Sequence, residues 1–142
     1  MQSSDARIIN PPDFLERSEI DARIIKYGGH VTIGSHGENQ GIGFHNELWA
    51  LEMGGLSNME ALRAATISGA EGLGIQDDLG SIKVGKIADL IILGKNPLED
   101  IHNTLNIRYV MKSGILYDAE YLNTVWPNQK TVPEWQLNEN NN

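Results

Sequence analysis

Three of the four histidines of this 142-residue chain stand close together, in the stretch HVTIGSHGENQGIGFH at residues 30–45. His30, His36 and His45 are separated there by glycines and by Glu38. Imidazole and carboxylate groups are ligands that zinc accepts, and they also transfer protons in acid–base catalysis. The chain has no cysteine, so any bound metal needs His, Asp or Glu ligands. The stretch is therefore a metal site, a substrate loop, or a glycine-rich turn that carries imidazoles.

Three familiar motifs in this stretch are incomplete. His45-x-Glu47 has the spacing of the zinc deaminase H-x-E motif, but the P-C-x-x-C that completes that motif requires cysteine. The GENQGIG run lacks the Lys and Ser or Thr of a phosphate-binding loop. Ser35 lies in G-S-H-G, which is not the G-x-S-x-G of a nucleophile elbow.

Composition excludes several classes of partner. The hydrophobic fraction is 40% and the charged fraction is 21%, as in soluble globular proteins. A formal net charge of −8 opposes binding to a nucleic acid backbone. No window approaches the roughly 20 apolar residues of a membrane helix, and no signal peptide is visible at the N-terminus. We therefore expect a soluble protein of undetermined compartment, with no nucleic acid partner and no membrane span.

The expected order of elements is helix, buried strand, two helices, then a β-rich half. The third helix is predicted most clearly, because Ser57 and Glu60 have the spacing of a capping box. Lys112-Ser113-Gly114 has the composition of a hairpin connection. The expected helices are 14–27, 44–53 and 57–73, and the expected strands are 30–33, 81–84, 86–94, 106–111 and 115–119. These elements divide into a helical part at 1–78, a β module at 79–122 and a flexible tail at 123–142.

The short strand at 30–33 does not fit a complete domain. An apolar strand between helices normally belongs to a parallel sheet covered on both faces, and such a sheet needs sister strands. The rest of the chain offers no obvious candidates. The pattern is typical of the end of a larger fold.

Residues 79–101, LGSIKVGKIADLIILGKNPLEDI, and 107–118, IRYVMKSGILYD, resemble the C-terminal segment of the amidohydrolase superfamily. MEALRAATISGAEGLGI at 59–75 is similar to a stretch of the same family. The resemblance is to metal-dependent hydrolases of the imidazolonepropionase and prolidase type, most of all to a subgroup often fused to TolB-like repeats. It implies an α/β fold: the last strand and helices of a (β/α)8 barrel, with strands of the flanking β-sandwich. A complete barrel takes about 250 residues, so this chain holds only part of one.

The resemblance also implies a site at the end of the strand at 30–33. Family members usually have an aspartate where this chain has His36. His36 can keep the metal role or the proton-accepting role of that aspartate, and the alternative is a histidine that only caps the strand end. Glu38 is a weaker candidate for the missing acid, against a solvated loop glutamate. We expect hydrogen-bonding or packing roles for His30 and His45, a surface position for His102, and a structural role for Asp89, tying a strand to a turn.

The function implied is hydrolysis of amide or cyclic amide C–N bonds of a small-molecule substrate by water activated on a divalent metal, zinc above all. This chain lacks most of the implied ligands, so we expect it to hold no metal tightly and to be inactive alone. The expected partners are the remainder of the barrel or a second copy of the chain. The alternative is a non-catalytic helix-plus-sandwich module that serves folding or association.

Overall fold

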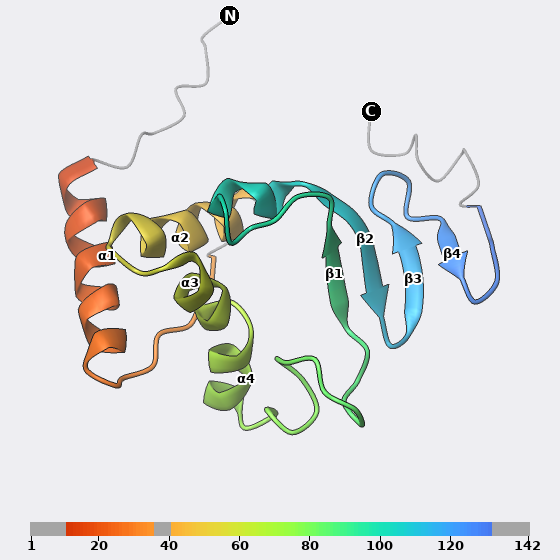
Figure 1. Cartoon of the computed structure of the whole chain (residues 1–142), viewed down its shortest axis with the longest axis horizontal. Coiled ribbons are helices and arrows are strands. Elements are labelled where there is room, and N and C mark those ends of the chain that lie inside the picture. The colour runs from red at the N-terminus through yellow and green to blue at the C-terminus, as the bar shows by residue number, and fades with distance from the viewer. Residues whose placement is uncertain (1–10, 36–40, 132–142) are drawn as a thin grey trace, which may run out of the picture.

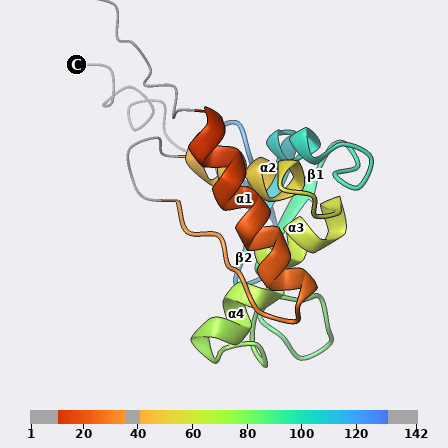
Figure 2. The same cartoon turned by 90° about the vertical axis from the view of Figure 1, so that its left-hand side faces the viewer.

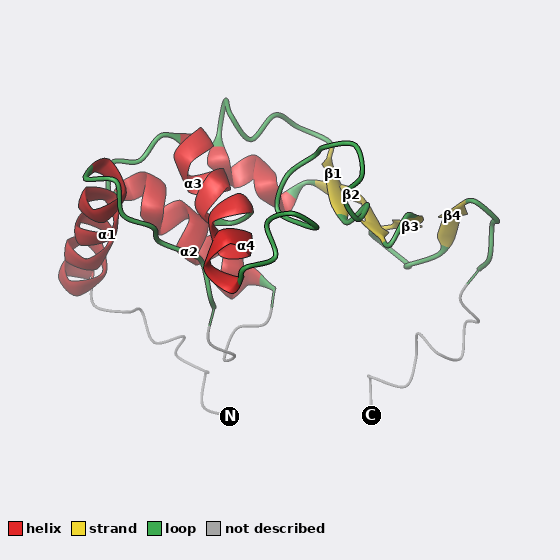
Figure 3. Cartoon of the chain, turned by 90° about the horizontal axis from the view of Figure 1, so that it is seen from below, coloured by secondary structure: helices red, strands yellow, loops and turns green. Residues whose placement is uncertain are grey.

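A computed structural model describes residues 11–35 and 41–131 of the chain. The described part has two halves, a cluster of helices and an antiparallel sheet (Figure 1). Seen from below, the helices gather at one end and the strands extend from the other (Figure 3). The elements are α1 (Pro11–Lys26), α2 (Ile42–Met53), α3 (Asn58–Ala64), α4 (Ile67–Leu73), β1 (Leu90–Leu93), the 3-10 helix η1 (Ile101–Leu105), β2 (Ile107–Lys112), β3 (Ile115–Asp118) and β4 (Thr124–Trp126). The mixture of helices and antiparallel strands agrees with the expected composition of the fold.

Helices α1 and α2 pack closely against each other, as the side view shows (Figure 2). Gly54 caps the C-terminus of α2 and lies against α1, where an added Cβ would stand 2.2 Å from the carbonyl oxygen of Ser18. Ala22 of α1 and Leu48 of α2 are each 1% exposed in the core beside this contact. Small residues at the crossing therefore allow the two backbones to approach.

The third expected helix is two helices. The predicted capping box is confirmed: Ser57 Oγ accepts a hydrogen bond from the amide of Glu60, and the Glu60 carboxylate accepts one from the amide of Ser57. The single helix expected at 57–73 is wrong, because the backbone leaves helical geometry at Thr66 (φ −132°, ψ −92°). The Thr66 hydroxyl donates 2.7 Å to the carbonyl of Leu62, a bond that can bend a helix.

The strand expected at 30–33 is absent from the described residues. Residues 29–35 have no regular secondary structure and no ladder partner in the described chain. Val31 and Ile33 still pack on the core while Thr32 is exposed, so the alternation of a strand is kept. Alternation fixes which side chains point inward, but a strand also needs a neighbouring backbone.

The sheet has four antiparallel strands in the order β1-β2-β3-β4. The predicted hairpin is confirmed, with Lys112 paired to Ile115 and a two-residue turn at Ser113 and Gly114. Both turn residues have positive φ, 50° and 81°, as a type I′ turn requires. Only one sheet is present in the described residues, so the β-sandwich that the resemblance implies is not seen in them.

Two segments of the β-rich half differ from expectation. Residues 81–84 form no strand, and Lys86 instead donates to Leu79 O (3.1 Å), Ser81 Oγ (2.7 Å) and Gln76 O, which folds the segment into turns. β4 lies within the stretch whose composition predicts a tail, and Thr124 also bridges to Lys130. Residues 132–142 of that stretch lie outside the described part.

η1 joins the two halves. Its Ile101 is 2% exposed and belongs to the same core cluster as Leu48, Leu51 and Ala61 of the helices. η1 therefore seats the β-rich half on the helical core. None of the described helices is both long and apolar enough to cross a membrane.

Candidate functional site

The two site residues predicted from the sequence, His36 and Glu38, lie outside the described residues. The structure does describe the chain on both sides of them. Just before His36, the backbone amide of Gly34 donates a hydrogen bond of 3.0 Å to Glu47 Oε2. After them the chain enters α2 at Ile42. The described chain before the candidate residues is therefore hydrogen-bonded to α2, and the described chain after them continues into α2.

Glu47 was not singled out as a site residue from the sequence. It appeared only as part of an incomplete H-x-E motif, and the partner of its carboxylate is a backbone amide 13 residues away. Glu47 is half-buried on α2. Its carboxylate pairs one backbone amide of residues 30–35, which in a sheet would be paired by the carbonyl of a neighbouring strand. Because Gly34 and Glu47 are 13 residues apart, the spacing of residues within this stretch gives no signal for their hydrogen bond.

His45 forms a hydrogen bond, as expected, but with a residue far along the chain. Its Nδ1 lies 3.0 Å from Thr104 Oγ1 of η1, 59 residues away. Its ring also lies edge-on to Phe44, with centroids 5.8 Å apart, and tilted to Trp49 at 6.1 Å. Burial lowers the pKa of His45 from its ordinary value of 6.5, which favours the neutral imidazole at physiological pH.

The other two described histidines, His30 and His102, are on the surface. His30 Nδ1 lies 3.5 Å from Glu71 Oε2, with a side chain that is 69% exposed. His102 is exposed, as predicted, and lies 2.9 Å from Asp100 Oδ1. The His102 ring also lies against the Trp49 ring, with centroids 4.5 Å apart and the two planes tilted by 34°. His30 therefore bridges to α4, and His102 belongs to the junction between α2 and η1.

The predicted structural role of Asp89 is confirmed. Its Oδ1 accepts a hydrogen bond of 2.6 Å from the amide of Ser113 in the hairpin turn, and its Oδ2 contacts Lys112 Nζ. The hydrogen bond and the cation hold the pKa of Asp89 below its ordinary value of 3.8. Asp89 thus ties the start of β1 to the turn between β2 and β3.

The described residues do not fit a zinc centre by themselves. No group of three His, Cys, Asp or Glu side chains comes together in residues 11–35 and 41–131. The closest approximations are the pairs His30–Glu71 and His102–Asp100, and each offers only two donors. A structural zinc site needs four ligands and a catalytic one three protein ligands, so neither pair is a metal site.

Sequence comparison identifies the family. A sequence model described as "Amidohydrolase family" matches residues 23–116, from α1 into β3. The chain belongs to the amidohydrolase family, as the motifs at 79–101 and 107–118 indicated.

Named relatives share limited lengths with this chain. An ochratoxinase of Aspergillus niger is 34% identical over 97 residues, which is 66% of this chain and 20% of that protein. A 5'-deoxyadenosine deaminase of Methanobrevibacter smithii is 40% identical over 68 residues, 48% of this chain and 15% of that protein. A solved Xaa-Pro dipeptidase with methionine in its active site matches with a TM-score of 0.64 and 35% identity, over 72% of this chain and 25% of that one. The chain therefore spans a quarter or less of each of these relatives.

Proposed function

We propose that this chain is the C-terminal part of a metal-dependent hydrolase that cleaves carbon–nitrogen bonds of amides or cyclic amides, and that it is inactive on its own. The observation that carries the proposal is the family match over residues 23–116, combined with coverage of only 25% of the dipeptidase chain. Within the complete enzyme, the chain provides the last segment of the barrel wall at 30–35, the helices that follow and the flanking sheet.

Within that enzyme, His36 is the residue that this chain contributes to the active site, with Glu38 as a weaker second candidate. The support is positional, because Gly34, two residues earlier, is anchored to α2 through Glu47. A divalent metal, zinc in our proposal, is held by groups outside the described residues, since those residues bring no three ligands together. Both the metal and most of its ligands thus belong to the remainder of the enzyme.

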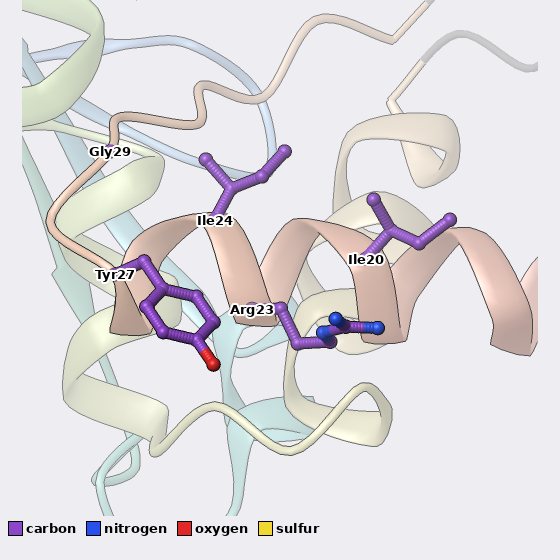
Figure 4. Close-up of a pocket in the computed structure, with 5 residues that line it drawn as sticks. All are labelled: Ile20, Arg23, Ile24, Tyr27 and Gly29. Atoms are coloured by element: carbon purple, nitrogen blue, oxygen red, sulfur yellow. The ribbon is translucent and has the colours of Figure 1, made fainter.

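This chain also offers a surface against which the remainder of the enzyme can pack. α1 carries an open pocket of about 510 Å³, lined by Ile20, Arg23, Ile24, Tyr27 and Gly29 (Figure 4). Tyr27 is 86% exposed and Ile20 is 49% exposed, although both side chains are largely apolar. We propose that the rest of the barrel covers this face. Without the rest of the barrel, the chain self-associates through the same face of α1. A chain that light scattering shows to remain monomeric at high concentration would contradict this self-association.

The second candidate function is a non-catalytic module for folding or association. It gains weight from His36, which stands where family members usually have an aspartate, and from the small share of each relative's length that the chain spans. The two candidates differ in what accompanies the chain, because a hydrolase needs metal ligands from a further segment and a binding module does not.

Expression of the parent open reading frame, with its upstream coding sequence, tests the proposal. If the chain is part of a hydrolase, we expect an H-x-H motif after a predicted strand in the upstream sequence and zinc in the purified parent protein. We also expect the parent protein to hydrolyse Xaa-Pro dipeptides or cyclic amides, and His36→Ala to reduce that rate at least tenfold. Upstream sequence in frame without that motif, or a zinc-loaded parent that hydrolyses none of these substrates, would favour the module instead.

A further inference from the structure

The outward face of α1 carries an apolar row. Ile20, Ile24 and Tyr27 follow one another at helical spacing on this face, and all three side chains are exposed (Figure 4). Ala22, on the opposite side of the same helix, is buried in the core. The row therefore points away from the rest of the described chain and is open to a partner.

Charged side chains border the apolar row on both sides. With 3.6 residues per helical turn, Glu16 and Arg23 fall on one flank of the row. Arg17 and Asp21 fall on the other flank. Glu16, Arg17 and Arg23 are exposed, and Asp21 is half-buried. Each flank of the row thus presents one acidic and one basic group.

These four charged groups are free to pair with a partner. The ion pairs among the described side chains lie elsewhere, at His30–Glu71, His102–Asp100 and Lys112–Asp89. An exposed charge without a partner in its own chain keeps its full capacity for a charge-assisted hydrogen bond to another molecule.

The local charge of α1 favours a second copy of this chain as the partner. The chain has a formal net charge of −8, so two copies repel each other over most of their surfaces. Between residues 16 and 26, however, α1 has three acidic and three basic side chains and is neutral. A strongly acidic or strongly basic partner would set like charges against half of them. Two copies can therefore approach through this stretch at the least electrostatic cost.

The charge pattern is also self-complementary in a two-fold pair of α1 helices. In an antiparallel pair, each flank meets the same flank of the second copy in reverse order. Arg23 then lies opposite Glu16 of the second copy. Likewise, Arg17 lies opposite Asp21. The midpoints of these two pairs differ by only about half a residue, which is about 0.75 Å of helix rise, and both fall beside Ile20.

A parallel pair of helices matches the charges as well. In that arrangement, the two different flanks meet at nearly equal height along the helix. Arg17 then lies opposite Glu16 of the second copy, and Arg23 lies opposite Asp21. Acidic groups therefore meet basic groups in both directions, with the two Ile20 side chains in contact at the centre.

We propose that the outward face of α1 is a pairing surface for a second copy of this chain, with Ile20 at the two-fold axis and acid–base pairs on both flanks. This pairing rests on the self-association proposed above and gives it a geometry. The open pocket beside Ile24 and Tyr27 gives room for side chains of the second copy.

The pairing surface is small. The stretch from residue 16 to residue 26 is about 16 Å long and about 10 Å wide. A standard interface buries roughly 800 Å² on each partner, well above what this stretch offers. The dimer is therefore weak and forms as the concentration of the chain rises.

Sedimentation equilibrium of the whole chain tests the acid–base pairs. We expect Arg23→Glu to raise the dissociation constant of the dimer at least fivefold, because it sets two acidic groups against each other. Lys95→Glu is the matched control, because it changes the net charge equally at an exposed position in the β-rich half, and it should raise the constant less than twofold.

Double variants decide whether the effect comes from pairing. Glu16→Arg combined with Arg23→Glu should restore the wild-type dissociation constant if the helices are antiparallel. Asp21→Arg combined with Arg23→Glu should restore it if they are parallel. Restoration by neither double variant would overturn the proposal.

Cysteine cross-linking supplies a readout that does not depend on the charge variants folding. The chain has no cysteine, so one introduced cysteine reports on one position. Ile20→Cys should give a disulfide-linked dimer on oxidation, because the two copies of residue 20 meet at the axis. Leu73→Cys, at an exposed position of α4, should stay monomeric under the same conditions. Equal cross-linking of the two variants, or none in Ile20→Cys, would overturn the pairing.

The failure of this pairing is distinguishable from failure of the proposed function. A wild-type chain that is monomeric at every concentration would overturn both the pairing and the self-association. The assignment to a hydrolase would stand or fall separately, on zinc content and activity of the parent protein.

Discussion

The backbone amide of Gly34 donates a 3.0 Å hydrogen bond to the Glu47 carboxylate, which joins the segment at 30–35 to helix α2. In a barrel, that segment would have strands on both sides. In this chain the carboxylate provides the hydrogen bond, and it does so two residues before His36. One side chain of α2 therefore fixes the position of the Gly34 backbone amide on that helix.

The first prediction concerns this anchor. Glu47→Ala should raise the hydrogen-exchange rate of the Gly34 amide about fivefold, the ratio that corresponds to about 1 kcal/mol for a lost hydrogen bond. Glu47→Gln retains an acceptor oxygen and should restore most of the protection. Glu52→Ala on the same helix serves as the control, and equal acceleration in that variant would show that the effect comes from α2 in general.

The second prediction concerns the contact of α1 with α2. Gly54→Ala should destabilise the chain by about 1–3 kcal/mol, because its new methyl group cannot avoid the Ser18 carbonyl without moving a helix. Gly69→Ala, in α4, has nothing within 4 Å of its added Cβ and should be neutral or stabilising. Chemical denaturation of both variants measures the difference, and a Gly54→Ala protein as stable as wild type would mean that the helices are further apart.

The third prediction uses Asp89. Its pKa is lowered from 3.8 by Lys112 and by the Ser113 amide, so the unfolded chain binds this proton first as the pH falls. The stabilisation is complete above about pH 4 and is lost below it. Thermal unfolding between pH 6 and pH 3 should therefore show a smaller loss of Tm in Asp89→Asn than in wild type. Identical pH profiles would indicate that the hairpin tie contributes nothing to stability.

Features that depend on neighbouring residues could be predicted from the sequence. The capping box of Ser57 and Glu60 and the turn at Ser113 and Gly114 are formed by residues within a few positions of one another, and both are confirmed. Asp89 was assigned to a strand-to-turn tie through the family motif, and the structure shows that tie.

Features that depend on distant partners could not be predicted in the same way. The strand expected at 30–33 has the right alternation, but no described strand pairs with it. The helix at 57–73 has helical spacing throughout, and the break at Thr66 becomes visible only in the backbone angles. The partners of His45 and Glu47 lie 59 and 13 residues away, so spacing within α2 did not reveal them.

Zinc analysis of the purified 142-residue chain after dialysis tests most directly the claim that it is one part of a metal-dependent hydrolase whose ligands lie mainly elsewhere. The described residues offer no group of three ligands, and His36 alone cannot supply the three or four donors of a zinc site. We predict far less than one zinc ion per chain, with no difference between wild type and His36→Ala. One tightly bound zinc ion per chain, lost in His36→Ala, would contradict the account.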